Sequence, residues 1–491
     1  CPSHKRHQLR AIQVLEVSSD ILKILPKIHP YVDSEPRTGI GGANLNSEQV
    51  QQIRPIMEAA FLRCTSYEWE QKMGVAEVPF IRHRTTDEWL RDPHTRMSQL
   101  VVRGVDGKDN IAPIGWIHDA DLHSIDASRC YESEESAHRF WEHIKSKEPS
   151  CLHGIRVVDL TNVIAGPTIG TCLARMGATV VKVDPPEPTY SPEIAVIYGI
   201  ATNIGKRSVL IDIMTTGGRL ILNKLLETAD VLIVNCTHDG LARSNLTKSD
   251  LDKINPHLIL THFDAWGGPA EKGPLINFVG YDDNVQAGTG IMNRFGGSIR
   301  EAEEHAHIGT IDVIAGVCGA ATTVCSLLRR KKTGISSVAR TSLAAVGQYL
   351  QYPFMFDKAE QTVGIGRLCR GIHSLHRCYR LQDVWVMLAS SPSNAASSDL
   401  QQSICAAFNI SSTNLIEGLL LEYTHSQLVD ALSHVRIGIS KLEKISTLRE
   451  SKMINAVDLN GATYQYLHIA DHPVGDLKIS APVAIRMSGI I

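Results

Sequence analysis

Asp312 is the acidic residue whose position in the sequence points most directly to chemistry. It stands at the start of the most apolar stretch of the chain, residues 313–328. A carboxylate at the start of a helix can cap that helix by accepting backbone N–H groups. In a cleft, the same helix end also favours a carboxylate nucleophile and any oxyanion that develops beside it. The residues alone leave both roles open.

Other reactive side chains occur without the spacing that their chemistry needs. His305 and His307 follow two glutamates, but neither the H-E-x-x-H pattern nor a Cys/His ligand spacing accompanies them. A solvated loop is therefore favoured over a metal centre, and no metal is expected. The sequence also lacks a G-x-S-x-G nucleophile elbow, and no cysteine stands near a histidine in a recognisable setting. Hydrolase chemistry has no support.

The elements that would position Asp312 alternate between strand and helix. Residues 155–160, 168–176 and 179–183 read as a strand, a helix and a second strand. Further strands are predicted at 208–213, 231–234 and 258–261, with helices at 217–229 and 248–254 between them. The pattern predicts an open parallel sheet with helices on both faces. Ligands of such sheets bind at the carboxyl ends of the strands, which are the loops after Leu160, Val183, Val234 and Thr261.

The first strand–helix–strand unit superficially resembles a dinucleotide-binding unit that ends in Asp184. Its turn, Ala165-Gly166-Pro167, lacks the G-x-G-x-x-G spacing, and proline has no backbone N–H to offer a phosphate. An NAD site is therefore the weaker hypothesis.

The pattern changes after Gly334. A helix over about 340–355, a strand at 384–388 and a final segment at 468–487 predict a smaller α+β domain. Near the start of the chain, residues 65–78 resemble residues 424–437, with apolar residues at matching positions. This match suggests an internal repeat.

Composition narrows the class of protein. The 491 residues carry 49 Lys+Arg against 52 Asp+Glu, a net charge of −3, which argues against nucleic acid as a partner. Eleven cysteines without a C-x-x-C pair predict free thiols in a reducing compartment, the cytoplasm first and a mitochondrion or other organelle as the alternative. The stretch 313–328 is too short and too rich in small residues for a membrane span, so no membrane association is expected.

A series of ordered motifs then resembles one family, the class III CoA-transferases, which include formyl-CoA and carnitine CoA-transferases and α-methylacyl-CoA racemases. The motifs are residues 154–161, 165–167, 173–186, 203–208, 229–235, 255–259, 280–282, 286–290 and 333–334.

The resemblance implies a Rossmann-like large domain plus a smaller α+β domain, in which two copies interlock like links of a chain. Tandem-fused members exist, and the sequence begins without Met. We therefore expect a fragment of such a fusion, either a homodimer or an intramolecular pseudo-dimer. Residues 1–149 would hold a linker and the tail of an upstream copy at about 50–120. The large domain would be 150–340, and the small domain with a C-terminal return segment would be 341–491.

The resemblance also implies a mechanism. Asp312 falls at the position of the family's nucleophile, which would attack an acyl-CoA and pass coenzyme A to a carboxylic acid through an anhydride and an aspartyl-CoA thioester. The positions implied for coenzyme A are Val163, Ile164, Ala165, Asn235, Cys236, Arg243 and Tyr281.

Two departures from the family pattern affect this interpretation. An arginine that family members carry soon after Asn235 is absent from the stretch Cys236-Thr237-His238-Asp239. Racemases place a histidine where Tyr281 stands, and tyrosine is a poor proton acceptor near neutral pH. A CoA-transferase is therefore favoured over a racemase-like enzyme. A CoA-transferase/lyase and a non-catalytic pseudoenzyme stay open as alternatives.

Overall fold

The computed structural model divides into two compact units. One comprises Cys1–Ile291, Ala306–Tyr352 and Tyr464–Ile491, and the other comprises Met292–His305 and Pro353–Thr463. This division falls later in the chain than the boundary expected at 340. The structure describes residues 5–25, 46–103, 107, 109–119, 150–186, 199, 201–296, 309–352, 370–391, 398–444, 447, 464–469 and 477–482. The predicted histidine loop at 305–307, and much of the final segment 468–487, lie outside these residues.

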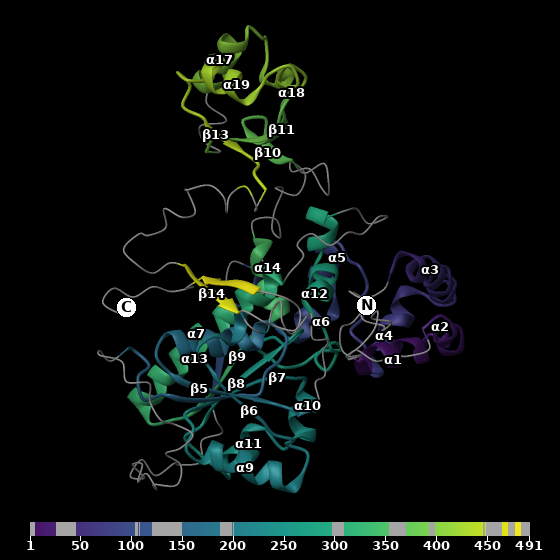
Figure 1. Cartoon of the computed structure of the whole chain (residues 1–491), viewed down its shortest axis with the longest axis vertical. Coiled ribbons are helices and arrows are strands. Elements are labelled where there is room, and N and C mark those ends of the chain that lie inside the picture. Colours follow the sequence, from purple (N-terminus) through teal and green to yellow (C-terminus); the bar gives the residue numbers. More distant parts are fainter. Residues whose placement is uncertain are drawn as a thin grey trace. The chain divides into compact units, whose positions relative to one another are not determined.

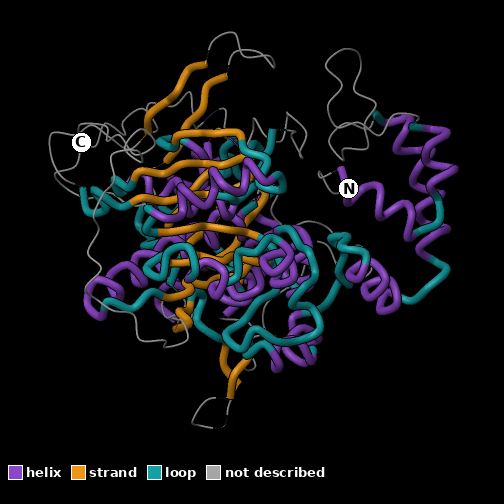
Figure 2. Tube along the Cα trace, turned by 90° about the horizontal axis from the view of Figure 1, so that it is seen from below, coloured by secondary structure: helices purple, strands orange, loops and turns teal. Residues whose placement is uncertain are grey.

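The larger unit contains a seven-stranded sheet in the order β3-β9-β8-β7-β4-β5-β6. The strands are β3 (Trp116–Asp119), β4 (Arg156–Asp159), β5 (Thr179–Asp184), β6 (Arg207–Leu210), β7 (Val231–Asn235), β8 (Ile259–Asp264) and β9 (Ser337–Ser342). Figure 2 shows these strands side by side. The six strands from β4 to β9 pair in parallel and follow the Rossmann order 3-2-1-4-5-6. The predicted open sheet is thus confirmed for these strands.

Two features of the sheet differ from the prediction. The edge strand β3 pairs antiparallel with β9, so the sheet is mixed, and β3 comes from the segment assigned to an upstream copy. The start of the helix predicted over 340–355 is wrong, because Arg340 to Ser342 belong to β9 and the helix α14 (Leu343–Leu350) begins only afterwards. β9 is buried on both faces yet polar in sequence, so it lacks the apolar run that marks such strands.

Helices cover both faces of the sheet (Figure 1). α9 (Thr216–Glu227), α10 (His238–Arg243) and α11 (Lys248–Asp252) share an apolar core with β4, β5, β7 and β8. On the other face, α7 (Ala165–Arg175) packs against the 24-residue α13 (Thr310–Thr333). A side chain at Gly316 would stand 2.4 Å from Thr168, so the two helices approach closely at small residues. α13 is long and apolar enough to cross a membrane by composition, but its small-residue face packs on α7 in this unit.

The described residues of the N-terminal segment, 5–25 and 46–97, form six helices. They are α1 (Lys5–Val14), α2 (Ser18–Ile24), α3 (Ser47–Phe61), α4 (Ser66–Val75), α5 (Thr86–Arg91) and α6 (Pro93–Met97). Trp89 and His94 join this segment to the sheet domain, because the Trp89 indole donates to Gln348 at 2.8 Å and the His94 ring meets the Trp266 carbonyl at 2.7 Å. A two-stranded ribbon, β1 (Val101–Arg103) with β2 (Asp109–Ile111), follows it.

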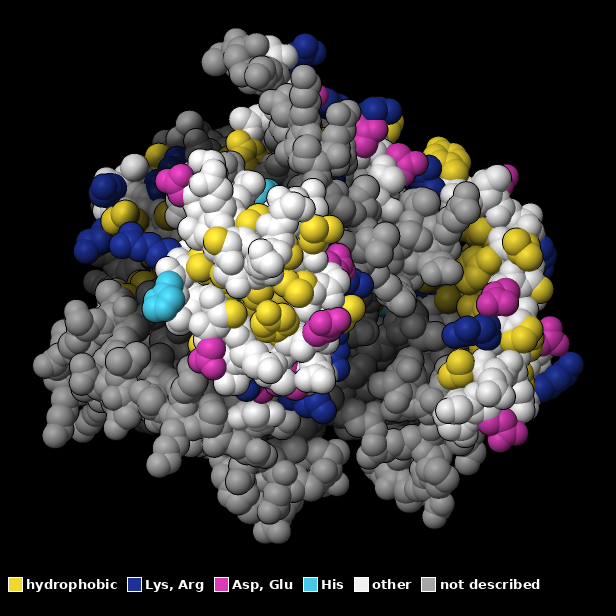
Figure 3. All heavy atoms as spheres, turned by 90° about the horizontal axis from the view of Figure 1, so that it is seen from above, with side chains coloured by type: hydrophobic (Ala, Val, Ile, Leu, Met, Phe, Trp, Pro, Cys, Tyr) yellow, Lys and Arg dark blue, Asp and Glu magenta, His cyan; other side chains and the backbone are white. Residues whose placement is uncertain are grey.

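The smaller unit is an antiparallel sheet with helices. Its described elements are β10 (Gly371–His373), β11 (His376–Arg380), β12 (Trp385–Ala389), β13 (Gly438–Lys441), α17 (Ser398–Phe408), α18 (Ile416–Leu420) and α19 (His425–Ala431). Hydrophobic side chains gather in the middle of the face seen in Figure 3, and several large apolar residues of this unit are exposed, Leu415, Leu421 and Val429 among them. A second ribbon, β14 (Tyr464–Ile469) with β15 (Leu477–Pro482), belongs to the larger unit.

The two segments proposed as a repeat share local structure. Thr65 and Thr424 each cap a helix, α4 and α19, through a reciprocal capping box. The matched pairs Trp69/Leu428 and Met73/Leu432 are all buried. The sequence similarity therefore corresponds to similar caps and buried positions.

A buried ion pair fixes the turn between β4 and α7. The Lys206 ammonium lies 2.7 Å from an Asp159 carboxylate oxygen and also donates to the Pro167 carbonyl at 2.7 Å, and the other Asp159 oxygen accepts the Thr161 amide at 2.9 Å. Asp159 is 0 % exposed, and burial holds the pKa of Lys206 below its usual range despite the Asp159 charge. The pair therefore holds the loop that follows Asp159.

Lys206→Met should strongly destabilise the protein because it leaves the Asp159 charge buried without a partner. We expect a loss of about 3–5 kcal/mol, which corresponds to a fall of roughly 6–20 °C in the thermal unfolding midpoint. Arg91→Met, which removes an exposed pair with Asp87, should cost less than about 1 kcal/mol. The double variant Asp159→Asn/Lys206→Met should recover part of the loss, and an equal or larger loss would contradict this account.

Candidate active site

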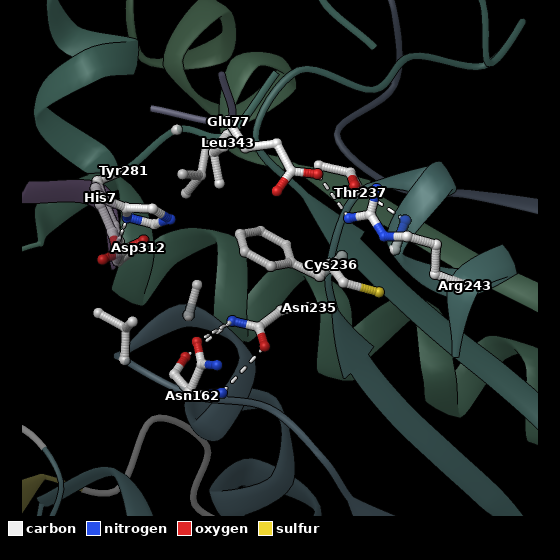
Figure 4. Close-up of a pocket in the computed structure, with 16 residues that line it drawn as sticks. His7, Glu77, Asn162, Asn235, Cys236, Thr237, Arg243, Tyr281, Asp312 and Leu343 are labelled. Carbon is white, nitrogen blue, oxygen red and sulfur yellow. Dashed lines mark hydrogen bonds and ion pairs between the residues drawn. The ribbon is translucent and has the colours of Figure 1, made fainter. Parts of the chain in front are cut away.

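A cavity of about 250 Å³ opens at the carboxyl ends of the parallel strands. Its lining comes from the ends of or loops after β4, β7, β8 and β9, from the start of α12 (Asp282–Thr289) and of α13, and from the N-terminal segment (Figure 4). The lining residues are His7, Glu77, Asn162, Val163, Ala165, Asn235, Cys236, Thr237, Gly240, Arg243, Phe263, Val279, Gly280, Tyr281, Asp312 and Leu343. The strand order reverses between β4 and β7, the place where doubly wound sheets bind ligands.

Two asparagines join the strand ends at this reversal. The Asn162 amide donates to the Asn235 side-chain oxygen at 3.0 Å, and the Asn235 side chain donates back to the Asn162 carbonyl at 2.9 Å. Val163, the next residue, has a φ of 68°, a left-handed conformation that β-branched residues rarely adopt. The Asn162–Asn235 bonds and the Asp159–Lys206 pair together hold this strained loop at the cavity.

Asp312 lies in the first turn of α13, and its side chain does not cap the helix. Gly309, with a φ of 61°, occupies the N-cap position. The Asp312 amide instead donates to a carboxylate oxygen of Asp282 at 3.0 Å. The capping role considered for Asp312 is therefore wrong, because Asp282, from the neighbouring helix α12 (Asp282–Thr289), performs it.

Burial dominates the electrostatics of this carboxylate pair. Burial, followed by the charges of Asp282 and Asp283, raises the pKa of Asp312 well above its usual range. Burial also raises the pKa of Asp282, against a hydrogen bond from Gln286 and the amide of Asp312. Two buried carboxylates beside each other cannot both ionise freely. An ionised Asp312 would therefore be poorly solvated and correspondingly reactive.

Arg243 reaches the cavity, and its charge is met by Glu77. The Glu77 carboxylate lies 2.7 Å from Arg243 through one oxygen and 2.7 Å from Arg10 through the other. Partial burial would raise the pKa of Glu77, but the hydrogen bond from Arg10 and the charges of Arg243 and Arg10 outweigh it and lower that pKa. Two arginines from distant parts of the chain thus share one carboxylate at the cavity.

The structure brings together most of the residues that the sequence singled out. Among the described residues, Asp312, Val163, Ala165, Asn235, Cys236, Arg243 and Tyr281 line the cavity, whereas Ile164 is buried and packs close to Gly309. Three of the four predicted strand-end loops also contribute, and the loop after Val183 supplies no described lining residue. Burial and the charge of Asp264 raise the pKa of Cys236 to about 12, so this thiol is a poor nucleophile.

Sequence reasoning missed His7, Glu77, Asn162 and the role of Asp282. Asn162 could have been found, because it and Asn235 follow strands that meet at the reversal of a doubly wound sheet. His7 and Glu77 carry no local signal, since they reach the cavity from α1 and from the turn after α4.

One cluster beside the cavity has the composition of a metal site. Ligand atoms of His238, His262 and Asp264 lie within 4.8 Å of one another. The buried Arg340 guanidinium already contacts Asp264 at 2.7 Å and His238 at 3.1 Å, and His262 bonds to the Cys236 carbonyl at 2.7 Å. A guanidinium in this position repels a metal cation. The cluster therefore fits a support for the Cys236 backbone better than a metal centre.

Comparison with known proteins identifies the family of this chain. Residues 152–458 match the model of CoA-transferase family III, which is more than half of the chain, so the chain belongs to that enzyme family. It is 33% identical over 428 residues to the CoA-transferase/lyase DddD of Marinomonas sp. (strain MWYL1), covering 81% of this chain and 51% of that protein. It is 34% identical over 197 residues to the succinate–glutarate CoA-transferase of Agrobacterium fabrum (37% of this chain, 48% of that protein). The chain thus spans about half the length of these curated relatives.

The fold has a solved counterpart. The orthorhombic crystal structure of Rv3272 from Mycobacterium tuberculosis superposes with a TM-score of 0.56 at 21% sequence identity, covering 69% of this chain and 94% of that one. The Rossmann-like architecture expected from the sequence is therefore also found in a protein of known structure.

Asp312→Asn should make the folded protein more stable at neutral pH. Between the ordinary and the raised pKa of Asp312, the folded state binds a proton that the unfolded state has lost, so stability falls as pH rises through this window. A neutral amide removes that loss, and we expect the thermal midpoint at neutral pH to rise by about 2–4 °C, the shift for about 1 kcal/mol. The gain should vanish at acidic pH, below the unfolded-state pKa.

The exposed Asp283 provides the matched control, and Asp283→Asn should change the midpoint much less. A midpoint for Asp312→Asn that falls at neutral pH would show that the carboxylate is stabilising and would contradict the assignment.

Proposed function

We propose that this chain transfers coenzyme A from an acyl-CoA to a carboxylic acid, with Asp312 as the covalent carboxylate. The observation that supports the proposal is the buried Asp312 carboxylate in the first turn of α13. Asp282, and not Asp312, accepts a free N–H group at the start of this helix. Its side chain lines a cavity at the strand-order reversal. Membership of CoA-transferase family III supplies the substrate class.

The reaction would proceed by exchanges at carbonyl carbon. An Asp312 oxygen attacks the thioester carbonyl, the carbon–sulfur bond breaks, and the thiolate of coenzyme A leaves an acyl–aspartyl anhydride. The thiolate then attacks the aspartyl carbonyl, which releases the donor acid and forms an aspartyl-CoA thioester. The acceptor carboxylate then attacks the aspartyl-CoA thioester, which forms a second anhydride and frees the thiolate. The thiolate attacks the acceptor carbonyl of this anhydride, which releases the new acyl-CoA and the Asp312 carboxylate. The positive end of α13 favours the oxyanions that form beside Asp312.

A second candidate function couples transfer to a lyase step on the acyl group. The relative that aligns over 81% of this chain is a CoA-transferase/lyase. This chain spans about half of that relative's length, so a lyase step is proposed for this chain and not taken over from the relative.

We also infer that residues 50–120 are the tail of an upstream copy, which would make the protein an intramolecular pseudo-dimer. The capping boxes and buried positions shared by α4 and α19 support a duplication. A homodimer is the alternative, and the mass of the native particle in solution distinguishes the two.

Asp312→Asn should abolish transfer, with a loss of about 10³-fold or more in kcat, because an amide cannot form the anhydride. Transfer would be measured between several acyl-CoAs and carboxylic acids. Peptide mass spectrometry of the wild-type protein incubated with acyl-CoA should show a coenzyme A adduct on the peptide that contains Asp312. Transfer that survives in Asp312→Asn, or an adduct elsewhere, would overturn the proposal, and Asp283→Asn serves as the control.

Glu77→Gln should strengthen binding of acyl-CoA. Loss of the carboxylate leaves the charges of Arg243 and Arg10 available to the phosphates of coenzyme A. We expect KM for acyl-CoA to fall by about threefold at low salt, with a smaller effect at high salt because the charges are screened. Glu58→Gln, an exposed change on α3, should leave KM unchanged. A higher KM in Glu77→Gln would show instead that Glu77 positions Arg243 for binding.

A further inference from the structure

A histidine from the first helix contacts the tyrosine that lines the cavity near Asp312. His7 Nδ1 lies 3.1 Å from the Tyr281 hydroxyl, and the two rings meet edge to face with centroids 6.0 Å apart. Both side chains line the same cavity as Asp312, and Figure 4 shows all three on one side of it. His7 and Tyr281 are 274 positions apart in the sequence.

The backbone around Asp282 holds Tyr281 and Asp312 in register. Tyr281 immediately precedes Asp282, and the carboxylate of Asp282 accepts the amide of Asp312 at 3.0 Å. The Tyr281 amide is itself bound to the Asn284 side chain at 2.9 Å. One residue and one hydrogen bond therefore connect the backbone of Tyr281 with that of Asp312, which limits the relative movement of the two backbones.

A phenol alone does not accept a proton near neutral pH, because it titrates near about 10 and is therefore still protonated. An imidazole titrates near about 6.5, so a large fraction of it is neutral and can accept a proton. A hydrogen bond between them changes what the phenol can do. As Tyr281 accepts a proton from a substrate atom, it can pass its own proton to His7 Nδ1, so that the imidazole supplies the basicity. With His7 adjacent, Tyr281 is not limited to the basicity of a lone phenol.

We propose that Tyr281, backed by His7, removes the proton from C2 of an acyl-CoA bound in this cavity. The inference rests on the proposed function, because it needs the thioester carbonyl near Asp312, one bond away from C2. Tyr281 would be the catalytic residue, and His7 would act through it. The substrate class is an acyl-CoA with hydrogen at C2.

The step balances without any further reactant. The C2–H bond breaks, the proton goes to the Tyr281 oxygen as the Tyr281 proton goes to His7, and the electron pair becomes an enolate on the thioester oxygen. Return of a proton gives exchange at C2. Where C3 carries a leaving group, the pair forms the C2–C3 double bond, and the leaving group departs with the electrons of its own bond to C3.

The test is hydrogen exchange with propionyl-CoA in D₂O, followed by mass spectrometry of the recovered thioester. The wild-type chain should incorporate deuterium at C2, and Tyr281→Phe and His7→Ala should each lower the initial rate by about 10²-fold, the usual scale of general-base catalysis. Added imidazole should restore exchange in His7→Ala and not in Tyr281→Phe. His434→Ala, an exposed change in the smaller unit, is the control.

His7→Gln separates a chemical from a structural role, since glutamine can still hydrogen-bond to the phenol but cannot take its proton. Low exchange in His7→Gln with an unchanged thermal midpoint supports the proposal. Absence of exchange in the wild type, or full exchange in His7→Gln, overturns it.

Coenzyme A transfer is measured in parallel so that the two proposals fail separately. Transfer without exchange overturns the role of Tyr281 and His7 and leaves the transferase proposal intact. Exchange without transfer or an Asp312 adduct supports proton removal and overturns the transferase proposal.

Discussion

The Asp159–Lys206 ion pair is the constraint on which the site depends. One ammonium group, buried with its partner, joins the end of β4, the start of α7 and the segment before β6. Desolvation makes such a pair costly unless every remaining donor and acceptor is satisfied, and here the Thr161 amide and the Pro167 carbonyl complete it. The loop that carries Asn162 and Val163 is therefore held rigidly enough to keep a strained valine at the cavity.

At the start of α13, two aspartates have different roles. A helix N-terminus needs acceptors for its free N–H groups, and a side chain that supplies them is no longer available as a nucleophile. Asp282 supplies an acceptor from α12, and Gly309 allows the tight entry of the chain. Asp312 is thereby left in the first turn as a buried carboxylate with a raised pKa. Loss of solvation is the main cause of that raised pKa, and in the proposed function the same loss would make the ionised carboxylate reactive.

The N-terminal segment contributes more to the site than its sequence suggests. His7 contacts Tyr281, and Glu77 binds both Arg10 and Arg243. Trp89, His94 and β3 attach this segment to the sheet domain, so the groups it supplies are held at the cavity within one compact unit. Part of the acid–base and charge balance of the cavity thus comes from residues that lie outside the stretch matched by the family model.

The sequence by itself determined the alternation of strands and helices from β4 to β8, the strand ends where a ligand would bind, and Asp312 as the residue to examine. Apolar periodicity and turn residues are local signals, so they survive without the fold. β9 was missed because its polar residues are buried through tertiary contacts, as in the contact of Arg340 with Asp264. Only the tertiary structure decided that Asp282 caps α13, that β3 closes one edge of the sheet, and that His7 and Glu77 face Tyr281 and Arg243. Each of these contacts joins residues far apart in the chain, and no local pattern encodes a pairing that chain folding alone brings together.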